Sequence, residues 1–103
     1  GQGFDLPNVP LFRELSSKKM MDVFNREKEE IRERIEKLYE EYNTSIMVWE
    51  SKISFEPIIG KIYHLYNFNG YRTLSLISPE EWNKEIDFIG SYMLNSENKW
   101  IKK

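Results

Sequence analysis

One apolar stripe runs through the first half of the chain at helical spacing. Phe24, Ile31 and Leu38 recur every seven residues, and a second seven-residue series is interleaved with them. We call the two series together the helix seam, whose members are Met21, Phe24, Ile31, Ile35, Leu38, Tyr42 and Trp49, with Lys28 as the polar position. Alternating steps of three and four residues place one apolar face along a helix, as in a coiled coil. The residues between are mostly charged, which is typical of a solvated helix surface.

The start of this helix is indicated by a change in composition. Residues 1–16 carry two Pro and two Gly, and we expect them to form an extended arm, with room for one short helical turn at Leu11–Leu15. Ser16 or Ser17 can then cap the helix, because a serine oxygen accepts a hydrogen bond from a first-turn N–H group.

The end of the helix is less sharply marked. We expect a helical segment over 17–55, with regular helix to about residue 52, because Ile46 and Ile53 continue the seam. A strand over 46–49 is the alternative that the pattern leaves open. A helix of about 36 residues would measure about 54 Å, which exceeds the diameter of so small a domain. Part of it must therefore protrude, kink or pair with a partner chain.

The second half of the chain, residues 56–103, predicts a small antiparallel domain. Asn69-Gly70 lies between two alternating runs and indicates a two-residue hairpin turn, because both residues tolerate positive φ. This turn sets a register in which Phe68 faces Tyr71, Tyr66 faces Thr73, His64 faces Ser75 and Ile62 faces Ile77. On the other face, Tyr63 pairs with Leu76 and Leu65 with Leu74. One face is therefore apolar and the other mixed.

Three shorter signals complete the predicted fold. Ser78-Pro79-Glu80-Glu81 combines a Ser cap, Pro at the first helical position and Glu at the third, which predicts one helical turn through Trp82. Asp87–Leu94 alternates and predicts a third strand, residues 95–98 a turn, and residues 99–102 a short fourth strand. The fold class is α+β: a long amphipathic helix, then a three- to four-stranded antiparallel sheet with one short helical turn.

Composition narrows the functions open to this chain of 103 residues. Its 40% hydrophobic and 31% charged residues indicate an ordered globular protein. The net charge of −2 argues against a general binder of nucleic acid or anionic membranes. The lack of cysteine excludes disulfides, thiolate zinc sites and a cysteine nucleophile. No apolar run approaches the roughly 18–20 residues of a membrane span, and no secretion signal is visible, so we expect a cytoplasmic protein.

Residues 57–100 also resemble a known family. The resemblance is carried by Pro57, Gly60, Tyr63, Leu65 and Tyr66, by Leu74-Ser75-Leu76-Ile77-Ser78-Pro79-x-Glu81-Trp82, by Phe88-Ile89-Gly90-Ser91-Tyr92, and by Trp100. These residues are similar to those of a family of uncharacterised proteins, a domain of unknown function whose members include the chromosome one open reading frame fifty product and similar small bacterial proteins. The resemblance implies no activity, cofactor or catalytic residue. His64 departs from the family, in which Tyr is frequent at this position.

Few residues suit catalysis. His64 is the only histidine, so a metal site would lack the further ligands it usually needs, and we expect a structural role. Glu80 and Glu81 lie in a predicted first helical turn, where the helix dipole favours anions. Gly60 and Gly90 belong to no phosphate-binding loop, and we expect Gly90 to leave room for a large neighbour such as a Trp. We therefore predict a non-enzymatic protein with no catalytic, cofactor or metal site.

Two apolar surfaces are left to explain. We expect Trp82 and Trp100 to close the ends of the sheet core. Tyr66, Phe68 and Tyr71, which we call the hairpin aromatics, gather near the hairpin tip. We favour their packing against the helix or against a second subunit, and the alternative is that they grip a peptide or stack on bases. We predict an interaction or scaffold module that self-associates through its helix, with a dimer favoured, and that holds a protein partner on its sheet. The alternative is a module that uses the hairpin aromatics to bind a small ligand or single-stranded nucleic acid, although few basic residues lie near them.

Overall fold

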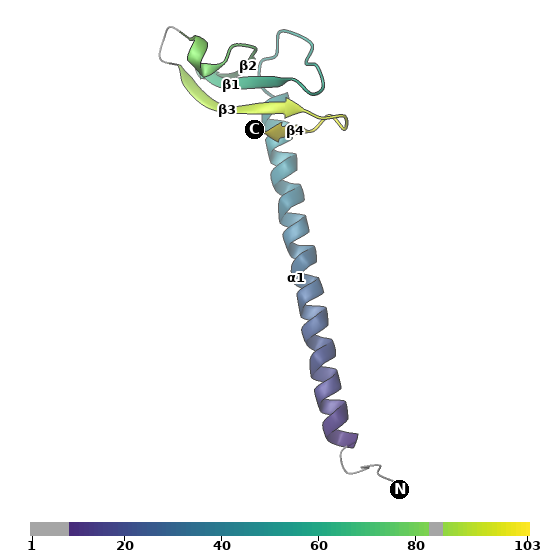
Figure 1. Cartoon of the computed structure of the whole chain (residues 1–103). Coiled ribbons are helices and arrows are strands. Elements are labelled where there is room, and N and C mark those ends of the chain that lie inside the picture. The colour runs from purple at the N-terminus through teal and green to yellow at the C-terminus, as the bar shows by residue number, and fades with distance from the viewer. Residues whose placement is uncertain (1–8, 83–85) are drawn as a thin grey trace. The chain divides into compact units, whose positions relative to one another are not determined.

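The computed structural model describes residues 9–82 and 86–103 (Figure 1). Helix α1 spans Val9–Trp49, and the strands that follow are β1 (Ile62–Phe68), β2 (Tyr71–Ser75), β3 (Asp87–Leu94) and β4 (Trp100–Lys102), with the 3₁₀ turn η2 (Pro79–Glu81) between β2 and β3. This is the predicted α+β fold. The chain divides into two compact units, Gly1–Glu36 and Lys37–Lys103, so the last turns of α1 belong with the sheet.

Helix α1 begins earlier than its composition indicates. Residues 9–16 are helical, which corrects the extended arm expected there, and residues 1–8 lie outside the described residues. Pro10 falls in the first helical turn, where the N–H that proline lacks would have no helical acceptor, so it does not interrupt the helix. Ser17 is not a cap, because its hydroxyl donates to the carbonyl of Arg13, one turn back, at 2.5 Å.

Helix α1 also ends earlier than expected, at Trp49, and no strand forms over 46–49. The Ser51 amide donates to the carbonyl of Val48 at 3.1 Å, and the Ser51 hydroxyl donates to the same oxygen at 2.5 Å. Serine therefore satisfies a carbonyl that the last turn leaves free, and the helical segment predicted over 17–55 is shorter at its C-terminal end.

The chain beyond α1 joins the free edge of β2. Lys52 lies parallel to Thr73: its N–H donates to the Arg72 carbonyl at 2.8 Å and its carbonyl accepts from the Leu74 N–H at 3.0 Å. Ile53 packs against the core from this extended segment. Ile53 therefore keeps the spacing of the helix seam but is not part of the helix. This explains why the predicted helix extends too far.

The hairpin of β1 and β2 has the predicted register. Its paired residues are Phe68 with Tyr71, Tyr66 with Thr73, Leu65 with Leu74 and His64 with Ser75. Asn69 and Gly70 have φ values of 54° and 83°, as a type I′ turn requires. Strand β2 ends at Ser75, whose hydroxyl accepts from the Ile77 N–H at 3.0 Å. The two pairs expected beyond this point, Ile62 with Ile77 and Tyr63 with Leu76, do not form.

Strand β1 lies inside the sheet. The strand order is β2-β1-β3-β4, and neighbouring strands are antiparallel. Strand β3 has the predicted bounds, and its register with β1 shifts between Leu65 and Tyr66. A Cβ atom on Gly90 would lie 2.9 Å from the hydroxyl oxygen of Tyr92. Gly90 therefore makes room for a large neighbour, as expected, and this neighbour is Tyr92 rather than a tryptophan.

The core lies between one face of the sheet and the end of α1. Its buried residues are Val48, Tyr63, Leu65, Leu74, Tyr92, Leu94 and Trp100. The Trp100 ring meets Trp49 and Tyr63 edge-on, with centroid distances of 5.5 and 6.1 Å. Trp100 thus has the core position predicted for it, whereas Trp82 packs against Tyr66 outside this cluster.

The predicted cap of η2 forms mainly through its glutamate. The Glu81 carboxylate accepts from the Ser78 hydroxyl at 2.8 Å and from the Ser78 N–H at 3.4 Å. Pro79 occupies the first position of the turn. The turn is 3₁₀ rather than α-helical, which is common for so short a piece.

Candidate functional site

The helix seam is exposed at every one of its apolar positions. The exposed fraction of these side chains runs from 41% at Trp49 to 62% at Ile31 and Tyr42. Met21, Phe24, Ile31 and Ile35 belong to the first unit, and Leu38, Tyr42 and Trp49 to the second. Large apolar side chains gathered on one stripe in water form the kind of surface that a partner covers.

Glu41, Ser45 and Val48 of α1, which we call the contact face, hold the sheet on one side of the helix, and Met47 also packs against the core. Val48 is fully buried in the core. The Ser45 hydroxyl oxygen accepts from the backbone N–H of Trp100 at 3.0 Å. Lys99 pairs with the Glu41 carboxylate at 3.4 Å. Packing, a hydrogen bond and an ion pair therefore all act on this one face of the helix.

The contact face and the seam point in different directions. With 3.6 residues per turn, the contact face lies roughly 75° around the helix from Leu38, Tyr42 and Trp49. Trp49 also contacts the sheet unit: its indole N–H donates to the carbonyl of Asn98 at 3.0 Å. The sheet thus covers a neighbouring face of α1 and leaves most of the seam open.

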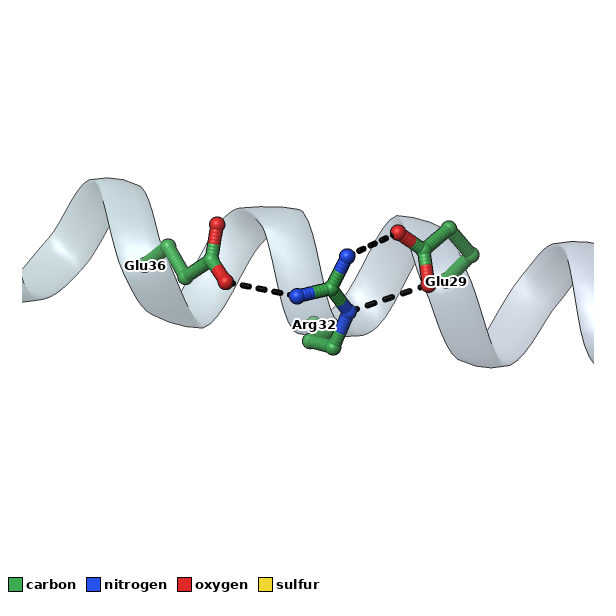
Figure 2. A network of polar contacts seen from close by, with 3 residues as sticks. All are labelled: Glu29, Arg32 and Glu36. Atoms are coloured by element: carbon green, nitrogen blue, oxygen red, sulfur yellow. Dashed lines mark hydrogen bonds and ion pairs between the residues drawn. The ribbon is translucent and has the colours of Figure 1, made fainter.

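Helix α1 carries a network of charged side chains on its solvated surface (Figure 2). Arg32 donates from Nε to Glu29 at 3.0 Å and from Nη1 to Glu36 at 2.7 Å, and its Nη2 makes a further contact with Glu29. The hydrogen bond from Arg32 lowers the pKa of Glu29, and the same bond raises the pKa of Arg32. Exposed pairs of this spacing favour the helix modestly and add little to tertiary stability.

The hairpin aromatics do not share one exposed cluster. Phe68 and Tyr71 are 49% and 73% exposed at the hairpin tip, whereas Tyr66 is only 2% exposed. The Tyr66 ring meets Trp82 edge-on at a centroid distance of 5.5 Å, and its hydroxyl donates to the Ile77 carbonyl at 2.7 Å. The Tyr66 side chain is therefore buried and held in place. Of the three hairpin aromatics, only Phe68 and Tyr71 are exposed enough to contact another molecule.

An apolar pocket opens beside these residues. It has a volume of about 360 Å³, at the lower end of the range for small-molecule sites. We call it the sheet hollow, and its apolar walls include Phe55, Tyr66, Phe68, Leu76, Trp82 and Ile86. Two of the three hairpin aromatics thus line one pocket together with residues from the end of β2 and with Trp82 and Ile86, which follow η2.

The surroundings of Tyr66 in this pocket shift the pKa of its hydroxyl. Burial raises the pKa of its hydroxyl, and the carboxylates of Glu80 and Glu81 act in the same direction, partly offset by Trp82. Because the folded-state pKa lies above the unfolded one, the neutral phenol stabilises the fold below a pH of about 10. This stability is lost as the pH rises through the folded-state pKa.

We therefore expect a shifted titration for Tyr66 in the folded chain. The absorbance at 295 nm of the wild type minus that of Tyr66→Phe should rise with a midpoint above a pH of about 10. In urea, the same difference should return to the ordinary tyrosine value. A folded-state midpoint at or below the urea value would contradict the burial of this hydroxyl.

A family match covers most of the described chain. The family described as "Protein of unknown function (DUF2452)" matches residues 11–103. The chain belongs to this family. The match includes residues 57–100, where the resemblance was found in the sequence, and extends over nearly all of α1. No curated protein and no solved structure matches the chain.

The single histidine of this DUF2452 chain ties two strands together. His64 of β1 faces Ser91 of β3, and its Nδ1 lies 2.8 Å from the Ser91 hydroxyl oxygen. The Phe88 ring lies 6.4 Å from the imidazole. A serine nucleophile also needs a group that orients its histidine, and no described carboxylate is hydrogen-bonded to His64. The contact between the two side chains joins neighbouring strands of the sheet.

Two kinds of feature are absent from the described part of the DUF2452 chain. Over residues 9–82 and 86–103, no three acidic or histidine side chains lie close enough together to hold a metal ion. Across the same ranges, no helix is both long and apolar enough to cross a membrane.

Sequence reasoning missed the contact face of this DUF2452 chain. Ser45 and Val48 lie beside the seam and carry no charge, in a helix whose other faces are mostly charged. That gap in the charge pattern is the signal that could have identified them. Phe55 was missed as well, because its stacking on Tyr63, at a centroid distance of 5.1 Å, needs the tertiary fold.

Proposed function

We propose that this DUF2452 chain is a non-enzymatic scaffold module that self-associates through the helix seam, with a second copy of the chain as its partner. The observation that carries the proposal is the exposure of all seven apolar seam residues while the sheet packs on a neighbouring face. Folding of a single copy leaves this stripe in water. Burial of its large side chains would supply the free energy of association.

The period of the seam favours another copy over an unrelated surface. A seven-residue apolar repeat packs best against a helix that has the same repeat, because each side chain fills a space between four residues of its partner. A second copy offers the same stripe over the same length. Lys28 is the polar seam position, and a single polar residue in such a core lowers stability while it fixes the register.

The test is the mass of the whole chain in solution. The wild type should form a dimer or a larger assembly of the 12.5 kDa chain in size exclusion with light scattering. The double variant Ile31→Glu with Leu38→Glu should be a monomer, because it places charges in the seam. The matched control is Lys37→Glu, which changes the net charge by the same amount outside the seam and should keep the wild-type mass.

Near-ultraviolet circular dichroism provides the folding control for these variants. Seam residues lie outside the buried core cluster, so the aromatic signal of the sheet should survive in the double variant. A wild type that is monomeric at all accessible concentrations, or a double variant that keeps the wild-type mass, would overturn the proposal.

A second candidate function is favoured by the sheet hollow. Tyr66 and Phe68 line a pocket large enough for a small ligand, which supports the binding module that the hairpin aromatics predict. Single-stranded nucleic acid is less well supported, because Tyr66 is buried and its ring is not free to stack on a base. A steep loss of affinity with salt would distinguish nucleic acid from an apolar ligand.

A further inference from the structure

Helix α1 carries its charges unevenly along its length. Residues 9–28 contain five Lys and Arg against three Asp and Glu, and residues 30–49 contain three against five. The N-terminal half is therefore net positive and the C-terminal half net negative. Two antiparallel copies place each basic half beside an acidic half, whereas two parallel copies place like charges side by side. The charge along α1 thus favours the antiparallel direction.

Lys28, the polar position of the helix seam, gives the same preference. In a parallel pair, equal positions of the two helices meet, so Lys28 would face Lys28 of the second copy inside the seam. Two like charges at such close range repel each other. In an antiparallel pair, the two seven-residue series of the seam face each other instead. Lys28 then lies opposite an apolar residue, and its long stem can carry the ammonium group out to water.

The register follows from the residues that flank the seam on the side of the contact face. We call this series the seam flank, and it consists of Arg13, Met20, Glu27, Arg34, Glu41 and Val48. Flanking positions of this kind set the orientation of paired helices, and in an antiparallel pair the seam flank faces the seam flank of the second copy. When Lys28 lies opposite Ile31 of the second copy, Glu27 lies beside Arg34 of that copy, twice by symmetry. A shift by one repeat places Glu27 beside Glu41 in one direction and beside Glu27 in the other.

The same register also matches the apolar layers and the length of the helix. Met21 lies opposite Leu38 of the second copy, and Phe24 lies opposite Ile35, each twice by symmetry. The midpoint of this register falls between residues 29 and 30, and the midpoint of α1 (Val9–Trp49) is residue 29. The two helices therefore overlap from end to end, and no turn of the seam is left without a partner helix.

Apolar side chains on the other flank of the seam fit this arrangement as well. Leu11 is exposed, although it is large and apolar. In the register given above, it lies beside Ile46 of the second copy, which is half-buried in the single chain. In a parallel pair, Ile46 would lie beside the carboxylate of Glu41 instead. The antiparallel pair thus covers an apolar residue outside the seam with another apolar residue.

We propose that two copies of this DUF2452 chain pair through α1 in the antiparallel direction, with Lys28 of each copy opposite Ile31 of the other. This inference rests on the proposed self-association and adds its direction and register. The two Ser45 residues that hold the sheets would then lie roughly 45 Å apart along the helix axis. The assembly is a spacer that presents one sheet at each end.

The direction can be measured with spin labels on the whole chain. The chain contains no cysteine, so one introduced cysteine carries one label per copy. Lys19→Cys and Glu33→Cys are matched variants, because both positions are exposed, lie outside the seam and are two seven-residue repeats apart. In the antiparallel pair, the labels lie roughly 31 Å apart along the axis at position 19 and roughly 10 Å at position 33. Pulsed electron paramagnetic resonance should therefore give a longer separation at 19, by roughly 10–15 Å.

A third label tests the register. Arg26→Cys lies one repeat before position 33 and equally far from the proposed midpoint, so the label separations at 26 and 33 should be equal. A shift of the helices by one repeat would lengthen one of them and shorten the other. Unequal separations at these two positions would overturn the register.

A charge exchange tests the predicted contact between the copies. Glu27→Arg should weaken the dimer about five- to tenfold, because it places a cation beside Arg34 of the second copy at two symmetric sites. The further change Arg34→Glu should restore the dimer. In a parallel pair, position 27 would lie beside Arg32 of the second copy, so the second change would not restore it.

The outcomes separate this inference from the proposed function. Equal label separations at 19 and 33, or a dimer that Arg34→Glu does not restore, would overturn the antiparallel arrangement even if the mass in solution is that of a dimer. A monomeric mass would overturn the self-association itself. Direction and association can therefore fail independently, because one is measured by the labels and the other by the mass.

Discussion

Replacement of Trp100 by alanine should destabilise the sheet by about 3–5 kcal/mol, a large part of the stability of a small domain. The side chain is 1% exposed and fills the space between Trp49 and Tyr63. The buried residues around it come from α1 and from the strands, so its removal leaves a cavity where several elements meet. The lost free energy of unfolding therefore has two parts, the lost burial of the Trp100 side chain and the cavity that it leaves.

Urea unfolding followed by near-ultraviolet circular dichroism measures this loss. The protein concentration must be fixed, because association shifts the apparent stability. Trp82→Ala is the matched control: it removes the same side chain from a half-buried position outside the core cluster, and it should cost less than half as much. Equal losses for the two variants would show that Trp100 is not the centre of the core.

Gly90→Ala should destabilise the chain by about 2–3 kcal/mol, although it adds a single methyl group. Glycine inside a strand is ordinarily less favourable than alanine, so a simple strand position would become more stable. Here the new Cβ would lie 2.9–3.2 Å from the nearest ring and hydroxyl atoms of Tyr92, which is itself buried. The ring would have to move within a packed core.

A double-mutant cycle with Tyr92→Leu tests this cause. If the ring of Tyr92 is the obstacle, Gly90→Ala should cost clearly less in the Tyr92→Leu background than in the wild type. The same urea titration provides all four free energies of unfolding. An unchanged cost would place the strain in the backbone of β3 and not in the tyrosine.

The parts of the fold that follow local rules were predictable. Asn69-Gly70 defined the hairpin and its register, because a two-residue turn leaves only one pairing of the flanking strands. The bounds of β3 followed from alternation alone, and Ser78 with Glu81 marked η2. Each of these signals is contained in a few consecutive residues.

The ends of α1 depend on more than local sequence. Pro10 indicated a break but lies in the one turn of a helix that accepts it. At the other end, Ile53 continued the apolar stripe, yet the pairing of Lys52 with the edge of β2 makes the chain extended there. Periodicity cannot distinguish a helix from an extended segment that buries the same residue.

The candidate sites also differ in whether consecutive residues or the tertiary fold determine them. The seam could be read from its repeat, but the sheet packs on the face of Ser45 and Val48, and only the fold shows this. The sheet hollow brings Ser54 and Phe55 next to Leu76 and Trp82. These residues lie far apart in the chain and meet only because β2 is an edge strand, so no sequence pattern predicted the pocket.

The exposure of the first unit has a consequence for the lifetime of the chain. No described side chain of residues 9–36 is buried, and none belongs to the core cluster. A helix without tertiary packing opens locally and often, and opened segments rich in Lys and Arg are ready substrates for proteases. If the seam pairs two copies as proposed, copies whose helix finds no partner would be degraded first, and turnover would match the amount of this protein to the amount of its assemblies.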